Sequence, residues 1–186
     1  MSTHSSPDAV HGTLFHSHLS SPRGDHLLPL NDLRDANPEL YTRHAEKYVA
    51  RPHGLTEPVA PLNCTWGDVV FLAPVHPAPL FEALARSGRA VAPAPPATID
   101  ASRLDPSRCV IRLMRHGRDG HHADPPDEHD YLPFNTAGLR AVSRVTQIAL
   151  DRLERLGPDD PWLPWVDVPH VLHRGPIPLA WFTAPR

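Results

Sequence analysis

An uninterrupted apolar run, Asp68 to Ala73, restricts more than any other feature how this chain can fold. It reads Asp-Val-Val-Phe-Leu-Ala, with no polar residue after the first. A strand with one solvated face alternates apolar and polar residues, so a continuous run of this length predicts a strand covered on both faces. We therefore expect this strand to lie at the centre of a sheet.

Three further segments carry the β-branched and aromatic residues that are typical of short strands. They are Thr13 to His18, Arg108 to Met114 and Val168 to His173. Because side chains alternate between the two faces of a strand, Leu14, His16 and His18 share one face of the first strand. In the last strand, His170 and His173 are three positions apart and point to opposite faces, so at most one of them can reach a given site.

Helical spacing and helix-end signals predict three main helices. They cover Asn37 to Val49, Pro77 to Ser87, and a longest helix that begins at Asn135 or Thr136 and runs to Leu156. The apolar face of the first helix should pack on a sheet. Shorter helical turns are expected within Leu27 to Leu33 and around Ala180 to Phe182.

These strands and helices alternate along a chain of 186 residues, a length that suits one domain. We expect an α+β fold, a single domain over residues 13–186 with a mixed β-sheet core and flanking helices. Residues 1–12 should form a flexible tail. The segment 116–130 is rich in histidine and acidic residues and poor in apolar ones, which predicts an exposed, mobile loop.

The composition argues against several classes of function. The net charge is −3 and arginines are scattered among acids, so no extended nucleic-acid surface is expected. The first ten residues lack the apolar core of a signal peptide, and no run approaches the roughly 18 apolar residues of a membrane span. The two cysteines lack metal or redox spacing, which favours a reducing cytoplasm. The expected partner is a small molecule, and the oligomeric state stays open.

Fourteen histidines make imidazole the main chemical clue. His16 and His18, about 7 Å apart on one strand face, can converge on one ion, with His44, His76 or His170 as a third ligand. The alternative is that these histidines are structural or bind a substrate. The loop pair His121-His122 is a second metal candidate, of the adventitious surface kind.

Strand order suggests a shared cleft. The first strand ends at His16 and His18, Trp66 and Asp68 enter the central strand, and His170 and Arg174 belong to the last. Arginine clamps phosphate, histidine donates to it and tryptophan stacks on a base, so such a cleft fits an anionic or nucleotide-like ligand. No Gly-x-Ser-x-Gly or Gly-x-Gly-x-x-Gly motif offers another assignment.

Several ordered fragments resemble the ADP-ribosyltransferase fold, which includes RNA 2′-phosphotransferases and ADP-ribosylating toxins. They are Leu14-Phe15-His16-Ser17-His18, Leu27-Leu28-Pro29-Leu30-Asn31, the strand Asp68 to Pro74 with its following helix, and Val171-Leu172-His173-Arg174-Gly175-Pro176-Ile177-Pro178. The resemblance implies NAD as cofactor and His16 or His18 as the dinucleotide contact. The late-strand glutamate of many members is missing, since Val168 to Arg174 offers only histidine and arginine with Asp167 before it.

Three functional hypotheses follow. The leading one is a small cytosolic enzyme, transferase-like, that binds a nucleotide-like or phosphorylated ligand in a histidine-lined cleft for ADP-ribosyl or phosphoryl transfer. Its catalytic residues would be His16, His18 and His170, and its ligand-binding residues Trp66, Asp68, His76 and Arg174. The alternatives are a divalent-metal enzyme that uses His16, His18 and a distant histidine, and a non-catalytic accessory protein that binds partners through its proline-rich and 116–130 segments.

Overall fold

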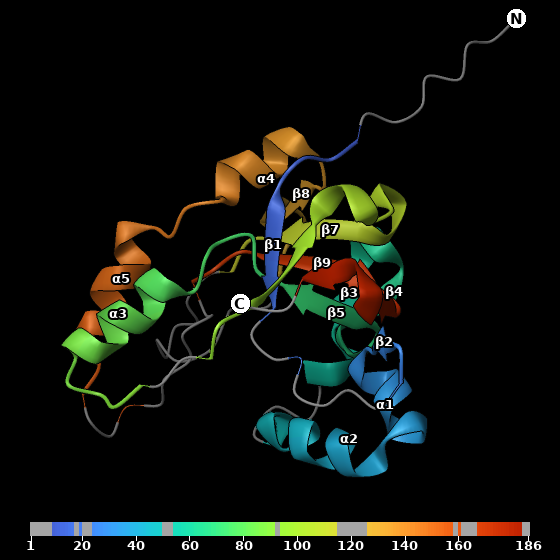
Figure 1. Ribbon diagram of the computed structural model, residues 1–186, viewed down its shortest axis with the longest axis horizontal. Coiled ribbons are helices and arrows are strands. Elements are labelled where there is room, and N and C mark those ends of the chain that lie inside the picture. Colours follow the sequence, from blue (N-terminus) through green and yellow to red (C-terminus); the bar gives the residue numbers. More distant parts are fainter. Residues whose placement is uncertain are drawn as a thin grey trace, which may run out of the picture.

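The computed structural model describes residues 9–16, 19, 24–49, 54–91, 94–114, 126–157, 160 and 167–183 (Figure 1). It confirms the α+β class. The helices are α1 (Leu30–Ala36), α2 (Pro38–Ala45), α3 (Ala78–Arg86), α4 (Thr136–Val142) and α5 (Gln147–Glu154). In Figure 1, α3 and α5 lie side by side at one side of the molecule, and α1 and α2 lie together at its lower end.

A four-stranded antiparallel sheet carries most of the buried backbone. Its strand order is β5 (Val69–Leu72), β9 (His170–Arg174), β7 (Cys109–Arg112) and β8 (Tyr131–Pro133). The apolar run does form a strand buried on both faces, because Val69, Val70 and Leu72 are each under 5% exposed. Its central position was predicted wrongly: β9 and β7 are central, and β5 is an outer strand of this ladder.

The outer side of β5 meets a second sheet. There the backbones of Ala73 and Phe15 exchange two hydrogen bonds of 2.8 Å, which join β5 to β1 (Thr13–His16). The second sheet has the order β1, β6 (Ala97–Asp100) and β11 (Phe182–Thr183). The edge of β5 is therefore covered by this junction, which explains why an outer strand can be continuously apolar.

Both faces of the four-stranded sheet are covered. On one face, Val70, Ile111 and Val171 pack into a core that also contains Leu14 and Ile99 from the second sheet. The opposite face carries a smaller cluster formed by side chains of the sheet and of the segment 54–68, namely Val59, Leu62, Val69, Val110 and Leu172. That segment contains η2 (Gly54–Thr56), β3 (Pro58–Val59), η3 (Ala60–Leu62), β4 (Cys64–Thr65) and η4 (Trp66–Asp68).

The longest predicted helix is in fact two helices. α4 ends at Val142, and the hydroxyl of Thr146 accepts a hydrogen bond of 3.2 Å from the Ala149 N–H to cap α5. The two helices bury their apolar side chains in different clusters. Leu139 of α4 belongs to the core on one face of the sheet, and Leu153 of α5 packs with α3 in a separate cluster. A single straight helix could not place its apolar face in both clusters, so the segment forms two helices, each with its own cap.

The predicted start of α2 is confirmed, because Asn37 accepts a hydrogen bond of 3.2 Å from the Leu40 N–H. The expected packing of its apolar face on a sheet is wrong. α2 lies against α1, none of its residues is buried, and Val49 beyond it is 78% exposed. The predicted helix over 77–87 is confirmed as α3, followed by Gly88 at a φ of 83°.

The two ends of the fold also differ from expectation. Val10, placed in the flexible tail, is 3% exposed. The expected terminal helix is a 3-10 turn, η8 (Leu179–Trp181), after which β11 pairs with β6. A short pair formed by β2 (His26–Leu27) and β10 (Ile177–Pro178) precedes it.

Most of the 116–130 loop lies outside the described residues. Its last residues form η7 (Glu128–Asp130), where the Asp130 carboxylate accepts a hydrogen bond of 3.0 Å from the Asp127 N–H. Asp130 is only 6% exposed. The expected exposure therefore does not hold for Asp130, whereas Asp127, Glu128 and His129 are exposed.

Candidate functional site

The first-strand histidine lies in the second sheet. His16 pairs with Ala97 in the β1–β6 ladder, and its ring lies 6.3 Å from that of Phe182. His18 falls outside the described residues. His76 is exposed, and its ring lies edge-on to Phe15 at 5.0 Å.

Asp68 and Arg174 make contacts that hold neighbouring segments together. The Asp68 carboxylate accepts hydrogen bonds from the Asn31 amide at 2.7 Å and from the Thr65 backbone and hydroxyl at 2.8 and 2.7 Å. Burial raises the pKa of Asp68, but these hydrogen bonds outweigh it and leave the pKa below its usual value. The Arg174 guanidinium donates to the Leu62 carbonyl at 3.2 Å. The pair therefore joins α1 and η3 to the sheet.

Trp66 and His170 both contact one neighbour, Phe71. The ring of Phe71 lies 4.5 Å from that of Trp66 and 6.0 Å from that of His170. The Trp66 indole N–H donates to the Tyr48 hydroxyl at 2.9 Å. The Arg112 guanidinium carbon lies 4.4 Å from the centroid of the Trp66 ring, in cation–π geometry.

Strand register explains why polar groups gather here. Arg112 of β7 lies opposite His170 of β9 on one side and opposite Tyr131 of β8 on the other. Directly opposed residues of antiparallel strands point to the same face, with Cβ atoms roughly 5 Å apart. We call these three residues, His170, Arg112 and Tyr131, the polar row. It lies on the face that the segment 54–68 covers.

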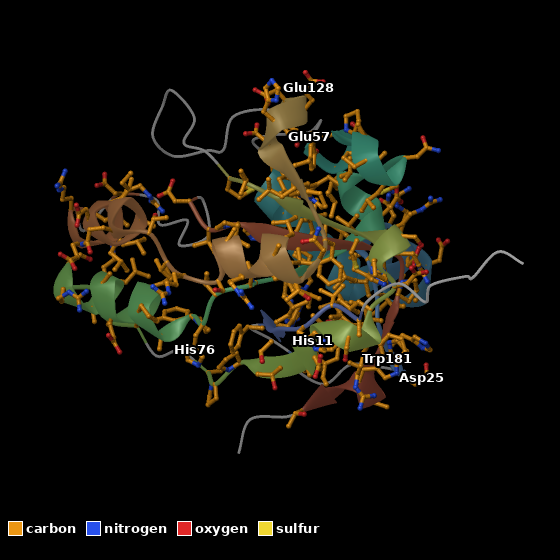
Figure 2. All side chains as sticks on the ribbon, turned by 90° about the horizontal axis from the view of Figure 1, so that it is seen from above. His11, Asp25, Glu57, His76, Glu128 and Trp181 are labelled. Carbon is orange, nitrogen blue, oxygen red and sulfur yellow. The ribbon has the colours of Figure 1, made fainter. Side chains whose placement is uncertain are left out.

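The segment 54–68 contributes the Glu57 carboxylate, which contacts the polar row. Arg112 is 3% exposed, and its Nη1 lies 2.7 Å from Glu57 Oε1. The Glu57 side chain is 16% exposed, so the two charges form a largely buried ion pair. In Figure 2 the labels of Glu57 and Glu128 lie at one end of the view, well separated from His76 and Trp181. The polar row and the exposed His76 are therefore in different parts of the molecule.

Three atoms of the polar row lack hydrogen-bond partners. Within the described part of the chain, four buried side-chain nitrogen or oxygen atoms have no partner, namely Arg89 Nε, Arg112 Nε, Tyr131 Oη and His170 Nδ1. Such atoms are rare in folded proteins, and each costs on the order of 1–3 kcal/mol. Three of the four lie in one row of neighbouring strands, which makes the polar row the candidate site.

His170 and Tyr131 of the polar row are neutral near neutral pH. Burial lowers the pKa of His170 to about 4, and the nearby Arg112 charge acts in the same direction. The Val168 backbone carbonyl favours the protonated ring and opposes this shift. Burial likewise raises the pKa of the Tyr131 phenol above its usual value. An imidazole with so low a pKa is a weak general base at pH 7, but it can exchange hydrogen bonds with a ligand.

His173 faces away from the polar row, as its spacing from His170 predicted. It lies opposite Cys109 on the other face of the sheet, is 2% exposed, and its Nδ1 lies 3.1 Å from the Gly175 carbonyl. Burial lowers the pKa of His173. Burial also raises the pKa of the Cys109 thiol to about 12 and that of Cys64 in the same direction, so neither is an activated thiolate.

Sequence reasoning missed Arg112, Tyr131 and Glu57. One signal was present: Arg112 interrupts the otherwise apolar run Cys-Val-Ile-Arg-Leu-Met, and a charge inside a buried strand needs a partner. The identity of that partner was not readable, because Glu57 is 55 positions away.

No group of three histidine, cysteine or acidic side chains capable of holding an ion occurs in the described ranges, which do not include His18. Those ranges also contain no helix long and apolar enough to cross a membrane. Comparisons with protein-family models, curated proteins and solved structures found no match.

Proposed function

We propose that the protein binds a small polar molecule at the polar row and acts on it as an enzyme, with a nucleotide-like ligand as the first class to test. The observation that carries the proposal is the set of three unpartnered buried atoms on His170, Arg112 and Tyr131. A folded chain gains nothing from leaving such atoms without partners. Binding sites commonly hold polar groups in this state, because a ligand then satisfies them.

The surroundings of the polar row support a ligand site over a packing defect. The Arg112 guanidinium is fixed from two sides, by the Glu57 carboxylate and by the Trp66 ring. Its free Nε–H therefore has a defined direction. A side chain held in this way is preorganised, which reduces the entropy that binding would otherwise cost. The phenol of Tyr131 can donate or accept, and so can the neutral imidazole of His170.

Thermal-shift measurements against NAD, nucleosides, nucleotides and sugar phosphates test the proposal. The decisive variant is Tyr131→Phe, which removes one unpartnered atom and keeps the ring. The matched control is Tyr41→Phe, since Tyr41 lies on α2 against Arg34 and outside the row. We expect at least one ligand to stabilise the wild type and the control, and to stabilise Tyr131→Phe much less. Equal responses from all three proteins, or none from the wild type, would overturn the proposal.

The hypothesis that the protein is a transferase makes a separate prediction. If the likeness to ADP-ribosyltransferases reflects a shared activity, NAD should stabilise the protein, and His16→Ala should abolish that response. His16 belongs to the second sheet and Tyr131 to the first. A NAD response that is lost in His16→Ala but kept in Tyr131→Phe would favour the resemblance over the polar row. The reverse pattern would favour the polar row.

A further inference from the structure

An exposed apolar side chain lies on the outer face of α5. Ile148 is 72% exposed, and among the described residues only Val49 is a large hydrophobic residue exposed to a similar degree. The opposite face of the helix is buried, since Ala149 and Leu153 are at most 1% exposed. Figure 1 shows α5 beside α3 at one side of the molecule. A single exposed apolar side chain is common in folded proteins, so the residues around Ile148 decide whether it belongs to an interaction surface.

The residues around Ile148 form a groove along α5. It has a volume of about 410 Å³, and its lining residues are Ile148, Asp151, Arg152, Arg155 and Leu156. At roughly 100° per residue, these five positions fall within an arc of about 140° on one face of α5 and the turn that follows it. We call these five residues the α5 groove. Its apolar residues lie at the two ends, about 12 Å apart, and its charged residues lie between them.

Asp151 and Arg155 of the α5 groove are only weakly paired within the chain. Arg155 Nη2 lies 3.8 Å from Asp151 Oδ2, and the two side chains are 81% and 42% exposed. An exposed ion pair of this kind contributes little to stability, so either residue can exchange its partner at little cost. Arg152 differs, because it pairs with Asp167 at 2.5 Å and both of these side chains are largely buried.

The order of these residues makes the α5 groove complementary to a second copy of itself. When two α5 helices pack antiparallel about a twofold axis at Arg152, residues equally far before and after Arg152 lie opposite each other. Ile148, four positions before, then meets Leu156 of the second copy, four positions after. Asp151 and Arg155 of the second copy are offset by two positions, about 3 Å along the helix axis, which their side chains can bridge.

We propose that the α5 groove is the contact surface of a twofold-symmetric dimer of this chain. Ile148 packs on Leu156 of the second copy, and Asp151 pairs with Arg155 of the second copy. Twofold symmetry makes each of these contacts twice. Because the surface is short, the dimer is weak, with a dissociation constant between about 1 μM and about 1 mM. The inference goes beyond the proposed function, since it concerns a surface on α5 and not the polar row.

Sedimentation velocity of the untagged full chain, from about 10 μM to about 1 mM, tests whether the dimer forms. The weight-average sedimentation coefficient should rise with concentration. Ile148→Glu places a charge against Leu156 of the second copy, so it should raise the dissociation constant at least about tenfold. The matched control is Val49→Glu, which introduces the same charge at the other exposed hydrophobic residue and should dimerise like the wild type.

Charge reversal tests the twofold arrangement itself. Asp151→Arg and Arg155→Asp each place like charges opposite each other, so each variant alone should dimerise at least about tenfold more weakly. In an equimolar mixture of the two variants, both contacts between positions 151 and 155 join opposite charges again. A heterodimer should therefore form, with a dissociation constant within about threefold of the wild-type value. Arg103→Asp, an exposed reversal outside the groove, is the charge-matched control and should dimerise like the wild type.

Three outcomes would overturn the inference. The first is a wild type that stays monomeric at about 1 mM, which is expected if a different protein or other residues of the same chain occupy the groove. The second is a dimer that Ile148→Glu leaves unchanged, and the third is a mixture of the charge variants that does not restore dimerisation. Circular dichroism of each variant checks its folding, and if Ile148→Glu does not fold, the two charge variants and their mixture decide. Ligand responses at the polar row are measured separately, so either proposal can fail without the other.

Discussion

The unpartnered hydroxyl of Tyr131 leads to an unusual prediction: removing it should stabilise the protein. Tyr131 Oη is buried without a hydrogen-bond partner. In Tyr131→Phe the ring stays against its neighbours, and no other described group loses a bond. The variant therefore avoids the cost of a buried hydroxyl and gains stability.

The magnitude follows from the cost of an unsatisfied group. Burying a hydroxyl without a partner costs on the order of 1–3 kcal/mol in protein mutational data. Since the residue as a whole is only partly buried, we take the lower end, about 1 kcal/mol. For a chain of this length, that corresponds to a rise of about 2–4 °C in the melting temperature. Urea denaturation should show a higher midpoint with an unchanged slope.

Tyr48→Phe is the contrasting control. Its hydroxyl accepts the Trp66 indole N–H at 2.9 Å, so the substitution leaves a donor without this partner and should cost about 1 kcal/mol. A loss of stability in Tyr131→Phe similar to that in Tyr48→Phe would refute the reasoning. It would show that an ordered water already satisfies Tyr131 in the free protein, and that the row has no unmet bonding there.

Three further substitutions test other parts of the structure. Glu57→Gln leaves the Arg112 charge buried and unneutralised, so it should lower the free energy of unfolding by about 3 kcal/mol in urea titrations; a loss below about 1 kcal/mol would mean that the pair is effectively solvated. Thr146→Ala removes the hydroxyl that accepts the Ala149 N–H and should cost about 1 kcal/mol, whereas an unchanged midpoint would deny the cap a role. Burial lowers the pKa of His170 from 6.5 to about 4, so the unfolded chain binds a proton in this interval that the folded chain does not, and stability falls as the pH falls from 6.5 towards 4. His170→Phe should lose less stability than the wild type between about pH 7 and about pH 5, and equal losses would contradict a low pKa.

The sequence correctly predicted the helices and strands that depend on residues close together in the chain. The cap at Asn37, the helix that ends before Gly88 and the apolar run of β5 were all visible in neighbouring residues. The centre of the sheet was not, because complete burial of β5 has two possible sources. It can come from flanking strands of one sheet or, as here, from a junction with a second sheet at Phe15 and Ala73.

The break between α4 and α5 shows a different limit. A helical stripe from Leu139 to Leu156 is compatible with one long helix, and no proline interrupts it. The division depends on the separate clusters in which Leu139 and Leu153 are buried. Thr146 was readable as a cap residue only with that knowledge, since threonine occurs inside helices as well.

The candidate site depends on register, which is why the histidine-based prediction identified only part of it. Trp66 and His170 were recognised by residue type, yet the groups that connect them come from pairings between distant strands. A shift of β7 by one residue would turn Arg112 to the opposite face of the sheet, away from Glu57. The buried ion pair and the register therefore support one another: the pair is stable only in this alignment, and this alignment places a fixed guanidinium N–H between His170 and Tyr131. The same pairing that specifies the sheet thus also positions the candidate site, so variants of Glu57 should disturb the alignment of β7 and the geometry of the polar row together.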